Sequence, residues 1–198
     1  VSDTIYDFNF HFSNPKEDNT GDKIAGHTLI LGATGTGKTT LETALLTFAM
    51  RFNPHLFVLD LDQGMHIYLK AIGGTYFVLE SGRPTGLNPF QLPDTPYNRE
   101  FIYQLVGICG KNTEGTLSAD EEKQIKQAVD TLFSLDFKNR TFSTLLESIP
   151  FSISDDSLRS RLGKWCATEG GRYAWCLDNP TNDFNPDEFY RIGFDLTD

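Results

Sequence analysis

Basic charge, cysteine and long apolar runs are all scarce in this sequence of 198 residues. Lysine and arginine together number 17 against 27 aspartates and glutamates, a formal net charge of −10, which weighs against a free-standing binder of duplex nucleic acid. The three cysteines are far apart in the sequence, so they exclude a disulfide framework and indicate a reducing compartment. No apolar run approaches the ~20 residues that a membrane-spanning helix needs.

Other absences bear on processing and on metal binding. The chain does not begin with Met, and its first residues lack the basic and apolar regions of a signal peptide. We therefore expect no leader, and we interpret the chain as a piece of a longer protein. Four scattered histidines show no zinc-ligand spacing. With 39% hydrophobic residues, the composition is typical of a soluble globular protein of one domain, with or without an insertion.

Apolar periodicity predicts an α/β frame in the first half of the chain. Alternation or short apolar runs predict strands, and these runs occupy residues 5–12, 27–32, 55–62 and 75–80. Helical spacing predicts helices at residues 39–50 and 64–74. The Pro- and Gly-rich stretch that follows residue 80 is typical of a loop.

The second half of the chain is predicted to be mostly helical. Helical patterns occupy residues 98–110, 118–135, 141–149 and 154–166. Ser118 and Glu121 have the spacing of a capping box, which favours a helix that starts directly after the serine. Strand-like patterns return at residues 170–180 and 189–196. We expect the helical block to be an appendage on the sheet and not one of its flanking layers.

A glycine-rich loop lies between the apolar run "HTLILG" and the helical pattern that starts near residue 39. The loop matches the phosphate-binding pattern G-x-x-x-x-G-K-[ST] through Gly32, Gly37, Lys38 and Thr39. Glycines let successive backbone N–H groups converge on phosphate oxygens, and the following helix adds its N-terminal dipole. Lys38 would contact the β- and γ-phosphates and the Thr39 hydroxyl would bind Mg²⁺. An ordinary strand-to-helix turn is the simpler but less specific interpretation.

The predicted nucleotide site therefore comprises one short segment. Its candidate ATP-binding residues are Gly32, Thr34, Gly35, Thr36, Gly37, Lys38, Thr39 and Thr40. Lys38 is the candidate catalytic residue, and we expect it to be exposed at the mouth of the loop. Asp60 and Asp62, at the end of the apolar run "LFVLD", are candidates for the Mg²⁺ water shell. Carboxylates at strand ends also commonly cap loops, so both interpretations of these acids stay open.

Basic residues surround Trp165 near the end of the predicted helical block. They are Arg159, Arg161, Lys164 and Arg172. An arginine finger or a nucleic-acid contact is a candidate role, but a solvated helix face is the more economical interpretation.

Three longer segments share an order and spacing with a known family. They are "GHTLILGATGTGKTT", then "AIGGTYFVLESGRPTGLNPFQLPDTPYNREF", then "RLGKW" leading to "GRYAWCLDNP" and "GFDLTD". Together they resemble the large VirB-type ATPases of bacterial type IV secretion and conjugation systems. The middle segment is the most specific, because a generic phosphate-binding loop does not require it. The resemblance runs from about Tyr6 to the last residue.

The resemblance implies a RecA-like P-loop fold, a three-layer α/β sheet with a helical insertion. Residues 1–94 would form the N-terminal part of the core, 95–165 the insertion, and 166–198 the return to a truncated core. It also implies hydrolysis of ATP with Mg²⁺ by a hexameric motor at the cytoplasmic face of the bacterial inner membrane. Other type IV secretion components would be its partners, and the motor would drive pilus assembly and substrate export.

One departure from the family pattern concerns catalysis. In that family the Walker B strand with its Asp-Glu pair follows the segment resembling "GFDLTD", and this chain ends at Asp198. We therefore expect an incomplete site that hydrolyses ATP weakly, unless Asp60 and Asp62 stand in for the missing acids. Two alternatives stay open for the function. One is a DNA-translocating ATPase of the coupling-protein type, and the other is a nucleotide-binding module that mainly makes subunit contacts.

Overall fold

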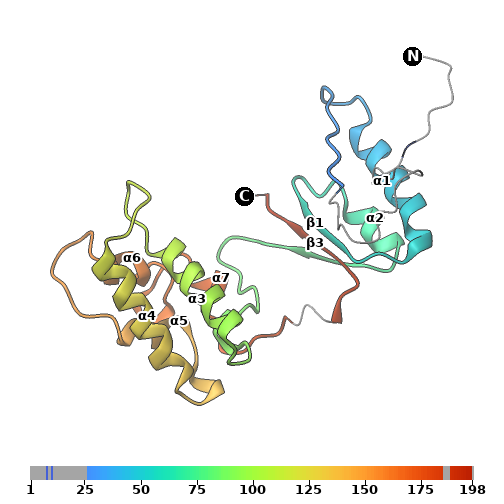
Figure 1. The fold of residues 1–198 in the computed structure, drawn as a ribbon. Helices are drawn as coiled ribbons and strands as arrows, with labels where there is room; N and C mark the ends of the chain where they lie inside the picture. Colours follow the sequence, from blue (N-terminus) through green and yellow to red (C-terminus); the bar gives the residue numbers. More distant parts are fainter. Residues whose placement is uncertain (1–7, 9, 11–25, 185–187, 198) are drawn as a thin grey trace, which may run out of the picture. The chain divides into compact units, whose positions relative to one another are not determined.

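The computed structural model describes residues 8, 10, 26–184 and 188–197 (Figure 1). The strand expected at residues 5–12 lies outside the described residues, apart from Phe8 and Phe10. The chain divides into two compact units, Val1–Pro54 and His55–Asp198. Each unit is described by itself below.

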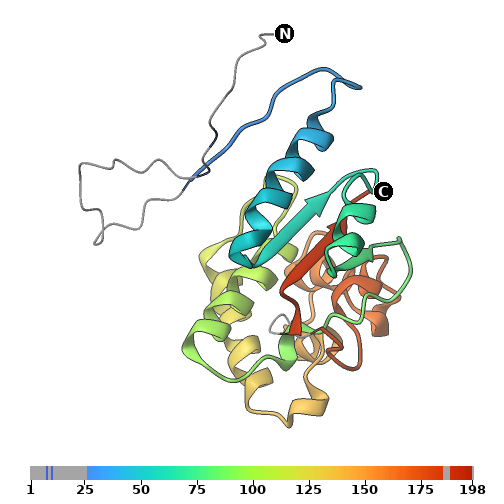
Figure 2. The ribbon, with the colours of Figure 1, turned by 90° about the vertical axis from the view of Figure 1, so that its right-hand side faces the viewer.

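The first unit presents an extended segment that leads through the glycine loop into helix α1, Lys38–Ala49 (Figure 2). A turn of 3-10 helix, Met50–Phe52, continues α1 and ends at Asn53 in the left-handed conformation. The helix expected at residues 39–50 is thus confirmed. The strand expected at residues 27–32 is wrong: no ladder forms there, and Leu29 and Leu31 are each 81% exposed. An apolar run becomes a strand only beside a partner, and the described sheet consists of three other strands that pair with one another.

The second unit contains a three-stranded parallel sheet of order β1-β3-β2. Its strands are β1 (Leu56–Asp60), β2 (Thr75–Val78) and β3 (Arg191–Asp195). All three match predicted strands. The last strand along the chain lies between the first two, with Asp60 opposite Asp195 in the register. The chain is therefore of the α/β class, and the central strand of its sheet is distant in sequence from the two outer strands.

Helix α2, His66–Ala71, connects β1 to β2 and covers one face of the sheet. Leu69 on this helix is fully buried. A Cβ atom at Gly193 would come within 2.4 Å of the Leu69 Cδ1 atom, so β3 needs glycine at that position for the helix to lie so close. The helix predicted at residues 64–74 is confirmed.

The other helices gather into one group (Figure 1). They are α3 (Pro96–Cys109), α4 (Ala119–Phe133), α5 (Phe142–Glu147), α6 (Leu158–Gly163) and α7 (Ala174–Leu177). Short 3-10 helices occupy Pro89–Gln91, Phe137–Asn139 and Ala167–Glu169. A continuous apolar core joins the group, with Phe90, Val129, Phe142 and Leu162 all fully buried. The described part of residues 96–163 contains no strand, as predicted.

Two local predictions for this group have opposite outcomes. The capping box at the start of α4 is confirmed, because Ser118 and Glu121 each accept a backbone hydrogen bond from the other. The strand expected at residues 170–180 is wrong, because the chain forms α7 there. Gly170 adopts a left-handed conformation (φ 63°) and Ala174 N–H bonds back to Gly171. A short apolar run does not distinguish a strand from a buried helix. Here the turns at Gly170 and Gly171 favour the helix.

The Pro- and Gly-rich stretch after β2 is fixed by a buried polar clamp. The Asn88 side chain is fully buried and donates to the carbonyl oxygens of Arg140 (2.9 Å) and Asn179 (2.7 Å). Gln91 donates to the Pro180 carbonyl oxygen at 3.0 Å and accepts from the Asn182 N–H at 2.9 Å. The clamp ties the segment that enters the helical group to the segment that leaves it.

Candidate functional site

The glycine loop is curled by two residues in the left-handed region. Gly35 has φ 80° and Gly37 has φ 84°, values that cost little for glycine but strain any residue with a Cβ atom. Between them, the Thr36 hydroxyl donates to the Ala33 carbonyl oxygen at 2.7 Å. A Cβ atom at Gly32 would lie 2.6 Å from that hydroxyl oxygen. The glycines of the predicted motif are therefore required by the conformation of the loop.

Lys38 lies across the loop it follows. Its Nζ atom donates to the carbonyl oxygens of Gly32 (2.8 Å) and Ala33 (2.9 Å). The side chain is half-buried, whereas the sequence analysis expected it to be exposed. The difference has a simple cause: with its own loop supplying two acceptors, the ammonium group has a nearer partner than water. The charge is held at the loop, and no carboxylate among the described residues of this unit forms an ion pair with it.

The N-terminus of α1 has no side-chain cap. Its capping position is Gly37, which has no side chain to accept from the first-turn N–H groups. Thr34, Thr39 and Thr40 are exposed in this segment. A helix N-terminus without a capping side chain, next to a lysine and exposed hydroxyls, suits an anion such as a phosphate group. The loop residues therefore fit the nucleotide phosphates that the motif predicts.

Asp60 is at the end of β1 and belongs to the second unit. Its Oδ2 atom accepts from the Met65 N–H and from the Tyr76 hydroxyl, each at 2.7 Å. Burial and this carboxylate raise the pKa of Tyr76. Asp62 is exposed and left-handed (φ 60°). Asp60 thus acts as a local acceptor that orders the turn before α2.

Asp195, at the end of β3, is an acid that the sequence analysis did not single out. It lies opposite Asp60 in the sheet and is 1% exposed. Its Oδ1 atom accepts from the Thr197 hydroxyl at 2.5 Å, and this bond is the main cause that lowers the pKa of Asp195. The sequence contains a signal for it, because "IGFD" ends in an acid after a short apolar run, as "LFVLD" does.

The basic residues near Trp165 are not one solvated face. Arg161 is buried, donates to the Gly110 carbonyl oxygen at 2.6 Å and pairs with Glu121. It therefore joins α6 to the end of α3 and the start of α4, which corrects the expectation of a solvated residue. Arg159 is half-buried, whereas Lys164 and Arg172 are exposed.

The described residues contain neither a preformed metal cluster nor a membrane-spanning helix. No group of three or more His, Cys, Asp or Glu side chains among them is arranged to hold a metal ion. Mg²⁺ usually keeps several waters and binds through one or two protein ligands together with substrate phosphates, so such a cluster is not required for it. No helix in this part of the chain has the length and apolar character needed to cross a bilayer.

The chain is similar to several known proteins. A family model described as the TraG P-loop domain matches residues 13–152. The type IV secretion system protein virB4 of Brucella suis biovar 1 (strain 1330) is 34% identical over 206 residues, which cover 96% of this chain and 24% of that protein. The type IV secretion system protein PtlC of Bordetella pertussis is 34% identical over 186 residues, which cover 88% of this chain and 23% of that protein.

A solved structure, that of VirB4 of Thermoanaerobacter pseudethanolicus, has a similar fold. The TM-score is 0.54 at 15% sequence identity, with 83% of this chain and 48% of that chain covered. The chain spans about a quarter of the length of the curated relatives it matches. These findings confirm the resemblance to the VirB-type proteins of type IV secretion. Because the family model covers well over half of the sequence, the chain belongs to the family of TraG P-loop domains.

Proposed function

We propose that the loop at residues 32–40 binds the phosphates of ATP, and that the chain is the ATP-binding part of a type IV secretion motor. The observation that carries this proposal is the position of Lys38, whose ammonium group bonds to two carbonyl oxygens of the curled loop. In loops of this pattern the lysine and the backbone N–H groups bind the phosphate chain together.

The roles of the loop residues follow from their chemistry. The N–H groups of the loop and of the first turn of α1 donate to phosphate oxygens. Lys38 would exchange its carbonyl partners for the β- and γ-phosphate oxygens, because an ammonium group is attracted more strongly to an anionic oxygen than to a neutral carbonyl oxygen. The exposed hydroxyl of Thr39 would hold Mg²⁺, which would supply positive charge to the phosphates. Asp60 and Asp62 remain the candidates for its water shell.

For the organisation of the chain, we propose a core in two pieces, residues 1–94 and 166–198, around a helical insertion at 95–165. The distribution of elements supports this division, since α3 to α6 fall between Pro96 and Gly163. The position of β3 between β1 and β2 also supports it, because that strand returns the chain to the sheet after the helices.

For the whole protein, we propose a hexameric ATPase at the cytoplasmic face of the bacterial inner membrane. Its partners would be other type IV secretion components, and its hydrolysis of ATP would drive pilus assembly and substrate translocation. The similarity to the type IV secretion system proteins virB4 and PtlC supports the assignment to such a system.

Phosphate release by the purified chain tests the catalytic part of the proposal. We expect slow turnover, because an arginine supplied in trans is worth about 10³–10⁵ in rate in P-loop GTPases, and an isolated chain would lack one. Glu80 is no substitute for a water-positioning acid, since it is exposed and pairs with Arg83 at 3.3 Å. Rapid turnover that is independent of chain concentration and lost in Asp60→Asn or Asp62→Asn would contradict this expectation.

Adding single-stranded DNA to the same phosphate-release assay distinguishes the secretion motor from the alternative of a coupling-protein-type DNA translocase. A secretion motor of the proposed kind turns over at the same rate with and without DNA, whereas a DNA translocase is stimulated. A chain that binds ATP, and releases no more phosphate than the Lys38→Ala variant does, would favour the non-hydrolysing module instead.

A further inference from the structure

A hollow of about 660 Å³ opens beside the C-terminal end of α6. Its lining includes three cationic side chains, Arg159, Lys164 and Arg172, and one acid, Glu169. We refer to these four residues and the space between them as the basic hollow. In a chain with ten more acids than bases, this local excess of positive charge is an inversion of sign and favours an anionic ligand.

Arg159 is held in place at the edge of the basic hollow. Its Nη1 atom donates to the carbonyl oxygens of Leu146 (2.6 Å) and Ile149 (2.9 Å) at the end of α5. Those neutral acceptors fix the guanidinium without cancelling its charge. Glu169 is 3.4 Å from Nη2 and is about half exposed, so it offsets one of the three cations and leaves two without such a partner in the hollow.

Lys164 and Arg172 are brought together by a close backbone approach. The Tyr173 N–H donates to the Lys164 carbonyl oxygen at 2.8 Å. A Cβ atom at Gly171 would lie 2.4 Å from the Gly163 carbonyl oxygen and 2.6 Å from that of Lys164, so only glycine allows the two segments to lie so close. The Arg172 guanidinium then stacks over the Tyr173 ring, 4.4 Å from its centroid. The two exposed cations are thus positioned by the fold.

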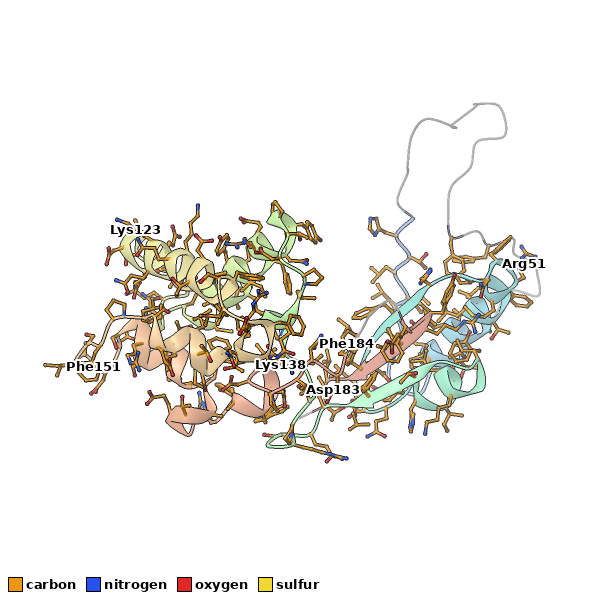
Figure 3. All side chains as sticks on the ribbon, turned by 90° about the horizontal axis from the view of Figure 1, so that it is seen from below. Arg51, Lys123, Lys138, Phe151, Asp183 and Phe184 are labelled. Carbon is orange, nitrogen blue, oxygen red and sulfur yellow. The ribbon has the colours of Figure 1, made fainter. Side chains whose placement is uncertain are left out.

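An aromatic ring stands at the rim of the basic hollow. Phe151 lines it and is 82% exposed. In Figure 3 this side chain lies at the outer end of the loop between α5 and α6 and points away from the helices. A single exposed apolar ring is common on protein surfaces, but this one lines a hollow that also holds three cations. Aromatic rings beside cations are the platforms on which unpaired nucleobases stack.

We propose that the basic hollow binds single-stranded nucleic acid, with Lys164 and Arg172 on adjacent phosphates and Phe151 stacked on a base. Arg159 is the fixed cation behind them. The exposed ring favours a single strand over a duplex, because paired bases present no free face. The inference goes beyond the proposed ATP site, since none of its residues belongs to the glycine loop.

Fluorescence anisotropy with a labelled single-stranded DNA oligonucleotide tests the proposal on the purified chain, in about 20–200 mM salt. The double variant Lys164→Ala/Arg172→Ala should bind about tenfold or more weakly. The slope of log K against log salt concentration should become shallower by about 1.4, the loss expected for two phosphate contacts with a single strand. Phe151→Ala should lose at least about fivefold in affinity with an unchanged salt slope.

The matched control is Lys123→Ala/Lys138→Ala, which removes the same charge from exposed positions elsewhere on the helical group (Figure 3). It should change the affinity by less than about twofold. An equal loss in both double variants would overturn the proposal, as would the absence of binding by the unmodified chain at about 20 mM salt. Vesicles with an anionic phospholipid form a second arm. If they bind the chain through Phe151 and the DNA does not, the nucleic-acid assignment is wrong.

Discussion

The Tyr76 hydroxyl donates to the Asp60 carboxylate at 2.7 Å, and this bond joins β2 to the C-terminal end of β1 across the intervening β3. The same carboxylate oxygen accepts from the Met65 N–H, so Asp60 also orders the turn that leads into α2. An acid that the sequence presents as a metal candidate is therefore used, within its own unit, to hold the sheet and its helix together.

Replacing Tyr76 with phenylalanine should lower the free energy of unfolding by about 1 kcal/mol, the usual contribution of one such hydrogen bond. Because the pKa of Tyr76 is raised in the folded chain, its contribution is complete below the tyrosine's ordinary pKa of about 10 and declines as the pH rises above it. Urea unfolding at pH 8 and at about pH 11 measures both effects. Tyr97→Phe is the control, because Tyr97 is 82% exposed. An equal loss in both variants would contradict the account.

Arg161→Met should lower the free energy of unfolding by about 3–5 kcal/mol, the cost of breaking a buried ion pair from one side. The arginine is buried and serves both Glu121 and the Gly110 carbonyl oxygen. Lys123→Met, at an exposed position of α4, should change stability by less than about 0.5 kcal/mol. Thermal or urea unfolding of the two variants measures the difference, and similar stabilities would show that Arg161 is not structural.

Glu121→Gln should destabilise the chain at neutral pH but not in acid. Burial acts to raise the pKa of Glu121, but the Ser118 N–H and Arg161 outweigh it, so the folded pKa is lower than usual. A lowered pKa stabilises the fold above the unfolded value of about 4.3, and that stabilisation is lost as the pH falls through the folded value. The difference in unfolding free energy between the unmodified chain and the variant should therefore shrink below about pH 4. Glu122→Gln, at the exposed neighbouring position, should show no such dependence.

Asn88→Ala should cost about 1–3 kcal/mol or more, because it leaves the buried carbonyl oxygens of Arg140 and Asn179 without this donor. Hydrogen exchange should also rise at residues 85–91 and 179–182, which the clamp connects. Asn139→Ala, at an exposed position, is the control. Unchanged exchange in the Asn88 variant would show that the clamp does not hold these segments.

Local patterns predicted the elements whose causes are local. The capping box of α4 and the apolar run of β1 both depend on residues within one element, and both are found as expected. The insertion of β3 between β1 and β2 depends on a contact across more than 100 residues, so no local pattern contains it. The strand expected at residues 170–180 failed because its apolar run is short and glycine turns fold it back as α7.

In the candidate site too, contiguous patterns were predictable from the sequence and contacts between distant residues were not. The glycine loop was predictable, because the phosphate-binding pattern is contiguous and its left-handed positions fall on glycines. The burial of Arg161 was not, because its partners Glu121 and Gly110 lie 40 and 51 residues away. Asp195 was missed although its strand ends in an acid as β1 does, since only the register places it beside Asp60.

Calorimetric titration of the chain with ATP in the presence of Mg²⁺ tests the central claim most directly. The unmodified chain should bind, and Lys38→Ala should bind about 10- to 100-fold more weakly, the loss expected for a charge-assisted contact. The variant should keep its unfolding temperature within a few degrees, because Lys38 bonds only to exposed loop carbonyls. Lys70→Ala, at an exposed lysine of α2, should bind like the unmodified chain. Equal affinity for ATP in the unmodified chain and in Lys38→Ala would contradict the account.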